Sequence, residues 1–116
     1  MKRQRAERGG RRAERLAAWW LRLHGWHILA TRARTPVGEV DLVARRGKVL
    51  AFIEVKARAT AAEANLALDD YRLRRVIAAA EVLQHRYARP GDDIRVDALF
   101  IVPWRLPRHL RNISIG

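Results

Sequence analysis

The chain has 116 residues, 49% of them hydrophobic and 31% charged, which indicates one globular domain and excludes a disordered protein. The formal net charge of +12 favours a polyanionic partner, either nucleic acid or an anionic membrane surface. The absence of cysteine excludes a disulfide framework and a thiolate metal site. The charged start and the lack of a long apolar stretch predict a cytoplasmic protein with no signal peptide and no membrane span.

The N-terminal segment is basic. Residues 1–10 are rich in Arg and contain the pair Gly9-Gly10, which predicts a flexible basic arm ahead of a single domain over residues 11–116. Both a solvated tail and a phosphate-contacting arm fit this composition. From about Arg11 to His24, apolar residues recur at spacings of three and four, which predicts a helix that Gly25 ends.

The pattern assigns a position to Trp20 of this first helix and leaves two alternatives each for Trp19 and Glu14. Trp20 falls on the apolar stripe and is predicted to lie in the core, whereas Trp19 lies off the stripe. Trp19 fits either a core position or a surface for stacking bases. Glu14 lies on the flank of the stripe, so it either pairs with neighbouring Arg residues at the surface or points at the edge of a sheet.

A first strand is predicted at Trp26–Arg34, followed by a β-hairpin over Gly38–Arg58. The hairpin combines strand-forming Val, Ile and Phe residues with a central turn that contains Gly47. It also carries acidic and basic side chains within apolar sequence, at Glu39, Asp41, Glu54 and Lys56. Such side chains cost free energy inside a sheet unless they are paired or bind a metal.

The register of this hairpin decides whether those side chains meet. With a two-residue turn at Arg46-Gly47, all four project from one face, because side chains alternate with a period of two. Asp41 and Glu54 are then diagonal neighbours, roughly 7–8 Å apart at the backbone, within reach of one cation. A one-residue change of loop length would separate them onto opposite faces. The alternative interpretation is an edge hairpin with a solvated polar face.

The second half of the chain predicts a helix, a strand and a short edge strand. Helical spacing of apolar residues continues to about Arg86, and Ile94–Val102 is dense in apolar residues as expected for a buried strand. A strand, a crossover helix and a strand imply a parallel pair. Asp97 is polar inside that strand and is predicted to pair with Arg95 or another neighbour. A further edge strand is predicted at Asn112–Ile115.

The elements therefore predict an α/β fold in which helices flank a mixed sheet. Two carboxylates on one face suit Mg²⁺ or Mn²⁺, which take oxygen ligands. Lys56, two residues after Glu54, lies on the same face, where it would hold a water nucleophile or offset negative charge in the transition state. The surrounding Arg residues would hold a nucleic-acid backbone. Together these groups predict a phosphodiester hydrolase.

The spacing of these charged residues resembles a known signature. Asp41 followed by Glu54-Val55-Lys56 is similar to the D…(D/E)xK signature of the PD-(D/E)XK nuclease superfamily. More closely, Gly38–Ala44 (GEVDLVA) and Phe52–Arg58 (FIEVKAR) resemble the YraN-like family of bacterial proteins. The resemblance covers most of the chain and includes the first-helix pair Ala13-Glu14, the turn Gly25-Trp26, and the last core strand at Arg95-Val96-Asp97.

This resemblance implies a restriction-endonuclease-like αβββαβ core and a likeness to Holliday-junction resolvases. It implies an active site of Glu14, Asp41, Glu54 and Lys56, with the three carboxylates as ligands of Mg or Mn. The implied partner is nucleic acid, DNA in particular, contacted by Arg34, Arg58, Arg72 and Arg75. The family often carries Lys where Arg72 stands in this chain, so the charge is kept but the chemistry differs. A homodimer is also expected, as in many structure-directed nucleases.

Two functions follow from these observations, with a third that depends only on the arm. The first is a metal-dependent nuclease acting on branched or damaged DNA. The second is a non-catalytic nucleic-acid-binding module on the same fold, which predicts salt-dependent binding without turnover. The third is an adaptor that docks a protein through the basic arm.

Overall fold

The computed structural model describes residues 2–58 and 70–113, with side chains for residues 11–58 and 71–113. The elements are α1 (Lys2–Leu23), β1 (His27–Thr35), β2 (Gly38–Arg46), β3 (Val49–Ala57), α3 (Asp70–Tyr87), β4 (Asp93–Ile101) and β5 (Arg108–Leu110). This order confirms the predicted α/β class and its α-βββ-α-β core. Within these ranges, no helix combines the length and apolar character needed to cross a bilayer.

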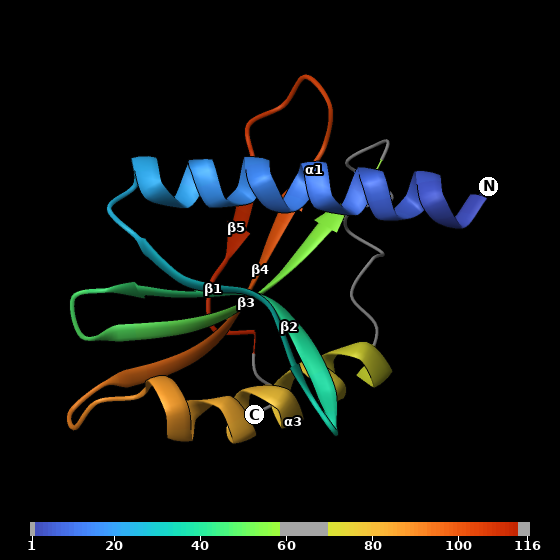
Figure 1. The fold of residues 1–116 in the computed structure, drawn as a ribbon. Coiled ribbons are helices and arrows are strands. Elements are labelled where there is room, and N and C mark those ends of the chain that lie inside the picture. Colours follow the sequence, from blue (N-terminus) through green and yellow to red (C-terminus); the bar gives the residue numbers. More distant parts are fainter. Residues whose placement is uncertain (1, 59–69, 114–116) are drawn as a thin grey trace.

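The five strands form one mixed sheet in the order β1-β2-β3-β4-β5. Only β3 and β4 are parallel, and α3 lies in the connection between them, as predicted. In Figure 1, α1 crosses one face of the sheet and α3 packs on the opposite face. The sheet is therefore buried on both sides, which explains the dense apolar sequence of its central strands.

Helix α1 is longer at its N-terminus than the apolar pattern predicts. The helix begins at Lys2 and so runs through the segment for which a basic arm was expected. The helix ends at Leu23, and the predicted stop is Gly25, whose φ of 86° a residue with Cβ seldom adopts. The N–H of Gly25 donates to Arg22 at 3.1 Å and the N–H of Trp26 donates to Leu21 at 3.0 Å, which is the Schellman pattern of helix termination.

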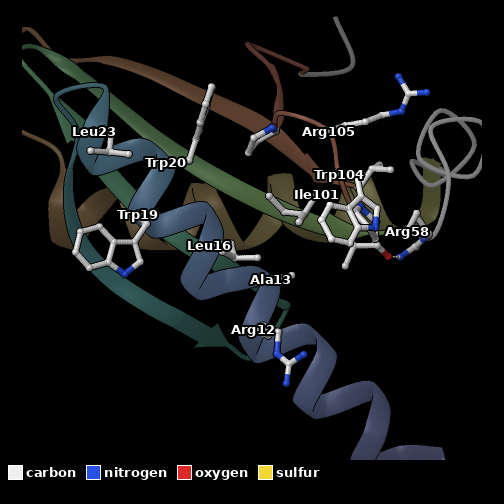
Figure 2. A pocket seen from close by; sticks show the side chains of 14 residues that line it. Arg12, Ala13, Leu16, Trp19, Trp20, Leu23, Arg58, Ile101, Trp104 and Arg105 are labelled. Atoms are coloured by element: carbon white, nitrogen blue, oxygen red, sulfur yellow. Dashed lines mark hydrogen bonds between the residues drawn. The ribbon is translucent and has the colours of Figure 1, made fainter.

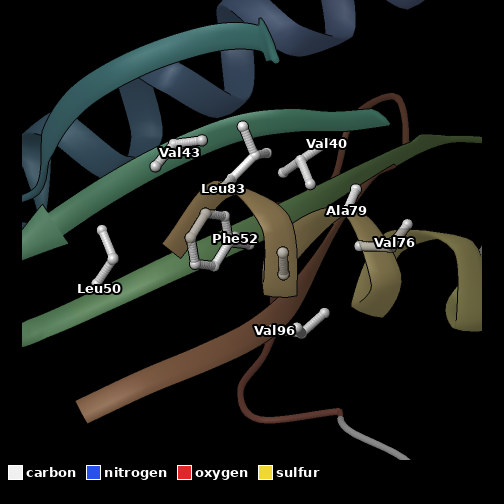
Figure 3. Close-up of a cluster of buried hydrophobic side chains, with 9 residues drawn as sticks. Val40, Val43, Leu50, Phe52, Val76, Ala79, Leu83 and Val96 are labelled. Carbon is white, nitrogen blue, oxygen red and sulfur yellow. The ribbon is translucent and has the colours of Figure 1, made fainter. Parts of the chain in front are cut away.

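Each helix covers its own cluster of buried apolar side chains. Residues of β2, β3 and β4 pack against α3 in the cluster drawn in Figure 3, whose members are Val40, Val43, Leu50, Phe52, Val76, Ala79, Ala80, Leu83 and Val96. On the other face, α1 packs against a second cluster made of Ala17, Leu21, Trp26, Leu42, Ala44, Ala51, Ile53 and Leu99. Trp20, which was predicted to lie in the core, is partly buried and packs against this second cluster. The two clusters fix the sheet between the helices.

The register of the central hairpin differs from the predicted one by two residues. Arg46 faces Val49 and Leu42 faces Ile53, so the turn residues are Gly47 and Lys48 rather than Arg46 and Gly47. Gly47 has a φ of 60°, and glycine is favoured at the first central position of a type II′ turn. A two-residue shift keeps the alternation of side chains, so Asp41 and Glu54 still share a face. The error therefore leaves the predicted site intact.

The C-terminal edge of the sheet also differs from the prediction. Strand β5 spans Arg108–Leu110 and pairs with β4, whereas an edge strand was expected at Asn112–Ile115. Residues 112 and 113 follow β5 outside any strand, and residues 114–116 lie outside the described part of the chain. In the observed pairing, Ala98 and Phe100 of β4 face Leu110 and Arg108 of β5.

A buried carboxylate holds this edge in place. Asp97 is fully buried and accepts hydrogen bonds from Arg95 at 3.0 Å, from His109 Nε2 at 2.8 Å and from the N–H of Asn112 at 2.8 Å. Burial alone would raise the pKa of Asp97, but these three donors outweigh it and hold that pKa below its usual value. The predicted pairing of Asp97 with Arg95 is thereby confirmed.

At the turn end of the hairpin, a second buried ion pair connects the sheet to α3. The guanidinium of Arg45 binds both carboxylate oxygens of Asp92, at 2.7 and 2.8 Å, and donates to the carbonyl of Tyr87 at 3.0 Å. The hydrogen bond from Arg45 and one from the N–H of Arg89 lower the pKa of Asp92 to about 2. This pair closes the connection between α3 and β4.

Candidate active site

Asp41 lies where the pairing of β2 with β3 ends. The last paired residues are Leu42 and Ile53, one position before Asp41 and Glu54 would face each other. Beyond that point, Asp41 Oδ2 accepts a hydrogen bond from the N–H of Val55 at 2.7 Å. The side chain thus satisfies a backbone donor that no strand pairing to β2 satisfies, and this contact orients the carboxylate toward β3.

Glu54 and Lys56 are two residues apart on β3 and form a buried ion pair. Lys56 Nζ lies 2.9 Å from Glu54 Oε1, and the two side chains are only 3% and 4% exposed. Arg72 of α3 reaches the same oxygen, also at 2.9 Å, although its own side chain is 56% exposed. One carboxylate oxygen therefore receives two cations, one from inside the sheet and one from the opening of a groove.

The two carboxyl groups of Asp41 and Glu54 interact directly. Burial and the nearby charge of Glu54 raise the pKa of Asp41 to about 7, against an opposing contribution from the N–H of Val55. A hydrogen-bonding interaction with Glu54 and the charge of Glu14 raise it further. Near neutral pH the Asp41 carboxyl is therefore held between its charged and neutral forms, as is typical of functional sites.

Glu14 of α1 approaches the same region from the other side. Its Oε2 accepts a hydrogen bond from Nε of Arg32 at 2.9 Å, so α1 and the edge strand β1 are connected by an ion pair. Arg32 has a φ of 50°, which is uncommon for a residue with Cβ. Both alternatives for Glu14 hold in part: the side chain pairs with an Arg, and that Arg belongs to the sheet's edge.

A groove of about 470 Å³ opens over the carboxylates. Asp41 and Glu54 line it together with three of the four predicted nucleic-acid-binding residues, Arg34, Arg72 and Arg75. The fourth predicted residue, Arg58, lies in a different groove beside α1. The arrangement brings positive charge to the rim and negative charge to the floor, which suits a phosphate group and a cation bound together.

Gly38 sets the distance between this groove's walls. A Cβ at Gly38 would lie 2.5 Å from the carbonyl oxygen of Arg75, so only glycine permits the start of β2 to approach α3 this closely. This approach brings α3, with Arg72 and Arg75, to the groove that Asp41 also lines. Neither the glycine's role nor the approach could be inferred from spacing along the sequence.

The donor set fits a hard divalent cation only in part. Asp41 and Glu54 supply oxygen ligands, and their mutual repulsion, visible in the raised pKa of Asp41, is what a divalent cation would relieve. Among the residues with described side chains, no three His, Cys, Asp or Glu groups gather closely enough to hold a metal ion. Glu14, predicted as a third ligand, instead pairs with Arg32. The third ligand therefore stays a prediction.

Sequence reasoning missed Arg32, which pairs with Glu14 and whose guanidinium is influenced by the charges of Glu14, Glu39 and Asp41. The available signal was weak. Arg32 and Arg34 alternate along β1 and share a strand face in the sequence pattern, but so do many exposed residues. The distorted backbone at Arg32 was not detectable from residue types.

Comparisons with known proteins identify the family and the fold. The model of the uncharacterised protein family UPF0102 matches residues 13–101. A UPF0102 protein of Sphingopyxis alaskensis is 66% identical over 113 residues, which are 97% of each chain. Another from Erythrobacter litoralis is 58% identical over 112 residues, again 97% of each chain. Among solved structures, a Holliday junction resolvase of Archaeoglobus fulgidus matches with a TM-score of 0.61 and 19% identity, over 86% of this chain and 73% of that one.

These matches confirm the family and the restriction-endonuclease-like fold that the sequence resemblance implied. The structural match is too distant in sequence to carry more than the fold.

Proposed function

The chain belongs to the uncharacterised protein family UPF0102, and we propose that it is a metal-dependent nuclease that hydrolyses phosphodiester bonds of DNA. The observation that carries this proposal is the pair of carboxylates, Asp41 and Glu54, that line an arginine-rimmed groove, with Lys56 buried beneath them and bound to Glu54. Burial and the neighbouring carboxylate of Glu54 raise the pKa of Asp41, and two carboxylates this close together are suited to holding Mg²⁺ or Mn²⁺.

The residues divide the work of phosphodiester hydrolysis among them. Asp41 and Glu54 would hold the divalent cation, which when bound polarises a phosphate oxygen and lowers the pKa of bound water. Lys56, held by Glu54 at 2.9 Å, is placed to orient an attacking water and to offset charge on the phosphate. Arg72, whose side chain is 56% exposed and bound to Glu54, would be free to contact a phosphate if Glu54 held a cation instead. Arg34 and Arg75 hold the backbone of the substrate.

Branched DNA is the substrate class that we propose first. The protein of Archaeoglobus fulgidus that shares the fold is a Holliday junction resolvase, and the same core here carries a strongly basic chain. The predicted homodimer would present two such sites to one junction, and its existence stays a prediction.

Cleavage of a labelled four-way junction, with linear duplex and single-stranded DNA alongside, tests the proposal. Wild-type protein is expected to cleave in Mg²⁺ or Mn²⁺ and not in EDTA. Glu54→Gln and Lys56→Met should each reduce the rate by at least about a hundredfold, while binding in EDTA changes less than about threefold. Glu81→Gln removes an exposed carboxylate elsewhere on α3 and is the matched control, which should cleave like wild type.

Cleavage that persists in Glu54→Gln after rigorous purification would show a contaminating nuclease and would contradict the proposal. A calorimetric titration with Mn²⁺ adds a readout that does not depend on turnover. Wild type should bind the ion, and Asp41→Asn combined with Glu54→Gln should not.

A non-catalytic nucleic-acid-binding module is the second candidate, and one observation favours it. Glu54 is already neutralised by Lys56 and Arg72 without a metal, so the cluster is satisfied as it stands. This function predicts DNA binding that weakens steeply with salt and no cleavage in any divalent ion. The junction assay above separates the two, because only the nuclease loses an activity in Glu54→Gln.

A further inference from the structure

A second groove lies beside α1, on the face of the sheet opposite to α3 (Figure 1). It has a volume of about 720 Å³ and runs between α1 and the segment after β4 (Figure 2). Leu16 and Trp20 line it from α1, while Ile101 and Trp104 line it from the opposite wall. Most of these side chains are apolar, yet several of them are open to solvent, including Leu16 and Trp104. Trp20 and Ile101 also pack against the second core cluster, whereas Leu16, Trp19 and Trp104 belong to neither cluster.

Trp104 is the most unusual residue of this groove. Its side chain is fully exposed, and its φ of 64° lies in the left-handed region that bulky residues rarely adopt. A large indole in water adds nothing to the core, and a strained backbone persists only where the surroundings hold it. In Figure 2, Trp104 lies near Ile101 and Arg58, whereas Trp19, also exposed, lies further along α1 toward Leu23. Two open indole rings thus border one groove.

The charge of the groove selects a negatively charged occupant. Three arginines line it, namely Arg12, Arg58 and Arg105, and none of its described lining residues is acidic. A second copy of this chain also carries a net charge of +12, so like charges would oppose self-association here. The occupant must combine negative charge with apolar or aromatic faces.

The groove is continuous in sequence with the candidate active site. Ala57 and Arg58, which line it, directly follow Lys56. The side chain of Lys56 holds Glu54 at 2.9 Å, so the end of β3 belongs to the site and the next two residues belong to the groove. The two grooves lie on opposite faces of the sheet, one beside α3 and one beside α1, and both reach the C-terminal part of β3 (Figure 1). A strand of nucleic acid that passes around this end of β3 would come to the arginines and the open indole rings.

Resting on the proposed function, we infer that this groove binds the unpaired bases of a single-stranded DNA segment adjoining the cleavage site. Exposed indole faces accept bases by stacking, and arginines beside them neutralise the phosphates, which is how single-stranded nucleic acid is commonly bound. Paired bases in a duplex are already stacked on one another and cannot enter. The substrate class is therefore DNA with an unpaired flap, tail or opened branch.

Binding of fluorescein-labelled dT20, measured by anisotropy in EDTA, tests this inference without any cleavage. Trp104→Ala is expected to weaken binding about tenfold, which corresponds to the loss of one stacked base. Trp104→Phe keeps an aromatic face and should recover most of the affinity. A blunt duplex of the same length should bind both variants within about twofold of wild type.

Two controls assign the effect to bases and to this groove. Leu106→Ala removes another exposed apolar side chain of the same loop, outside the groove lining, and should bind dT20 like wild type. An abasic strand with the same number of phosphates should bind wild type and Trp104→Ala equally, since only stacking distinguishes them. Circular dichroism should show the same helix content for all variants, because Trp104 makes no contribution to the core.

Three outcomes would overturn the inference. Wild-type affinity of Trp104→Ala for dT20 would remove the stacking role, and an equal loss on the abasic strand would show that Trp104 acts through charge or structure. Competition by poly-glutamate at the same charge concentration, lost in Trp104→Ala, would assign the groove to an acidic polypeptide instead. Binding of dT20 in EDTA requires no cleavage, and junction cleavage is lost in Glu54→Gln, so a failed nuclease and a failed single-strand groove give different results.

Discussion

Both ends of the central hairpin carry buried acidic side chains, but the pKa of the carboxyl group is lowered at one end and raised at the other. At the turn end, Arg45 binds both oxygens of Asp92 and the pKa of that carboxyl falls to about 2. At the other end, Asp41 lies against a second carboxyl, Glu54, and its pKa rises to about 7. The first arrangement stabilises the charged form that is present at neutral pH, and the second opposes it.

This difference separates a structural ion pair from a site. The Arg45–Asp92 pair has one acid, one base and a matching geometry, so folding alone accounts for it. At Asp41, burial and the charge of Glu54 disfavour the charged form at neutral pH, although Glu54 itself is paired with Lys56 and Arg72. Strain of this kind that no contact in the fold requires is typical of residues retained for binding or chemistry.

Breaking the structural pair should give the largest effect on stability. Arg45→Met leaves Asp92 without its guanidinium partner in a buried position, so we expect Tm to fall by roughly 10 °C at pH 7. The pKa of Asp92 is lowered in the folded state, so its contribution is present above about pH 4 and is lost as the pH falls toward 2. The difference in Tm between wild type and Arg45→Met should therefore shrink below pH 4.

Lys48→Met is the control for this experiment, because it removes a positive charge from the exposed turn next to the same pair. Its Tm should stay within about 2 °C of wild type. A drop of similar size in both variants would mean that net charge, and not the Arg45–Asp92 geometry, sets the stability of this end.

Neutralising the site should have the opposite sign. Because the pKa of Asp41 is raised above its ordinary value of 3.8, the folded protein binds an extra proton between about pH 4 and 7. The free energy of unfolding therefore falls as pH rises through this window, and the penalty is complete above it. Asp41→Asn imitates the protonated form and can still accept from Val55, so at pH 8 we expect a gain of roughly 1–3 kcal/mol.

Urea unfolding at pH 5 and pH 8 measures this gain, which should be smaller at pH 5 and accompanied by loss of the nuclease activity. Glu39→Gln, an exposed acid on the same strand, should change stability by less than about 0.5 kcal/mol at either pH. Lower stability of Asp41→Asn at both pH values would show that the charged carboxylate is structural, and the contrast between the two ends would fail.

The smallest effect on stability should come from the rim of the groove. Arg34 and Glu39 pair at 3.3 Å with both side chains more than half exposed, so Arg34→Ala should change the free energy of unfolding by less than about 0.5 kcal/mol. Its effect should appear in DNA binding, where the slope of log K against log salt decreases by about one. Arg86→Ala, at the far end of α3, is the control and should leave this slope unchanged. An unchanged slope in Arg34→Ala would show that Arg34 does not contact DNA.

The sequence predicts most of the fold because its signals are local and periodic. Alternation placed Asp41 and Glu54 on one face, and the helical stripe with Gly25 predicted the C-terminal end of α1. The exact register was missed because it depends on where Gly47 sits within the turn, and a shift of two residues leaves every periodic signal unchanged. The start of α1 at Lys2 was missed because the pair Gly9-Gly10 weakens a helix without preventing it.

Contacts between distant segments could not be predicted in the same way. Arg45 and Asp92 are 47 residues apart, and each has a simple local explanation as part of a strand or a turn. The close approach of Gly38 to Arg75 depends on how α3 packs, which the apolar spacing of α3 does not determine. Trp104 looked like an ordinary loop residue between Pro103 and Pro107, because neither its exposure nor its positive φ leaves a trace in residue types.

The parallel pairing of β3 with β4 has a consequence for how the molecule assembles. Strands β1 to β3 are joined by short turns, whereas β4 reaches β3 only after the whole connection from residue 58 to residue 92 has closed. Local pairs form with little loss of chain entropy, so we expect the three-stranded meander to form first and the parallel strand to dock last. We therefore expect Asp41, Glu54 and Lys56 to come together with the meander, and Arg72 to join them when α3 packs on it.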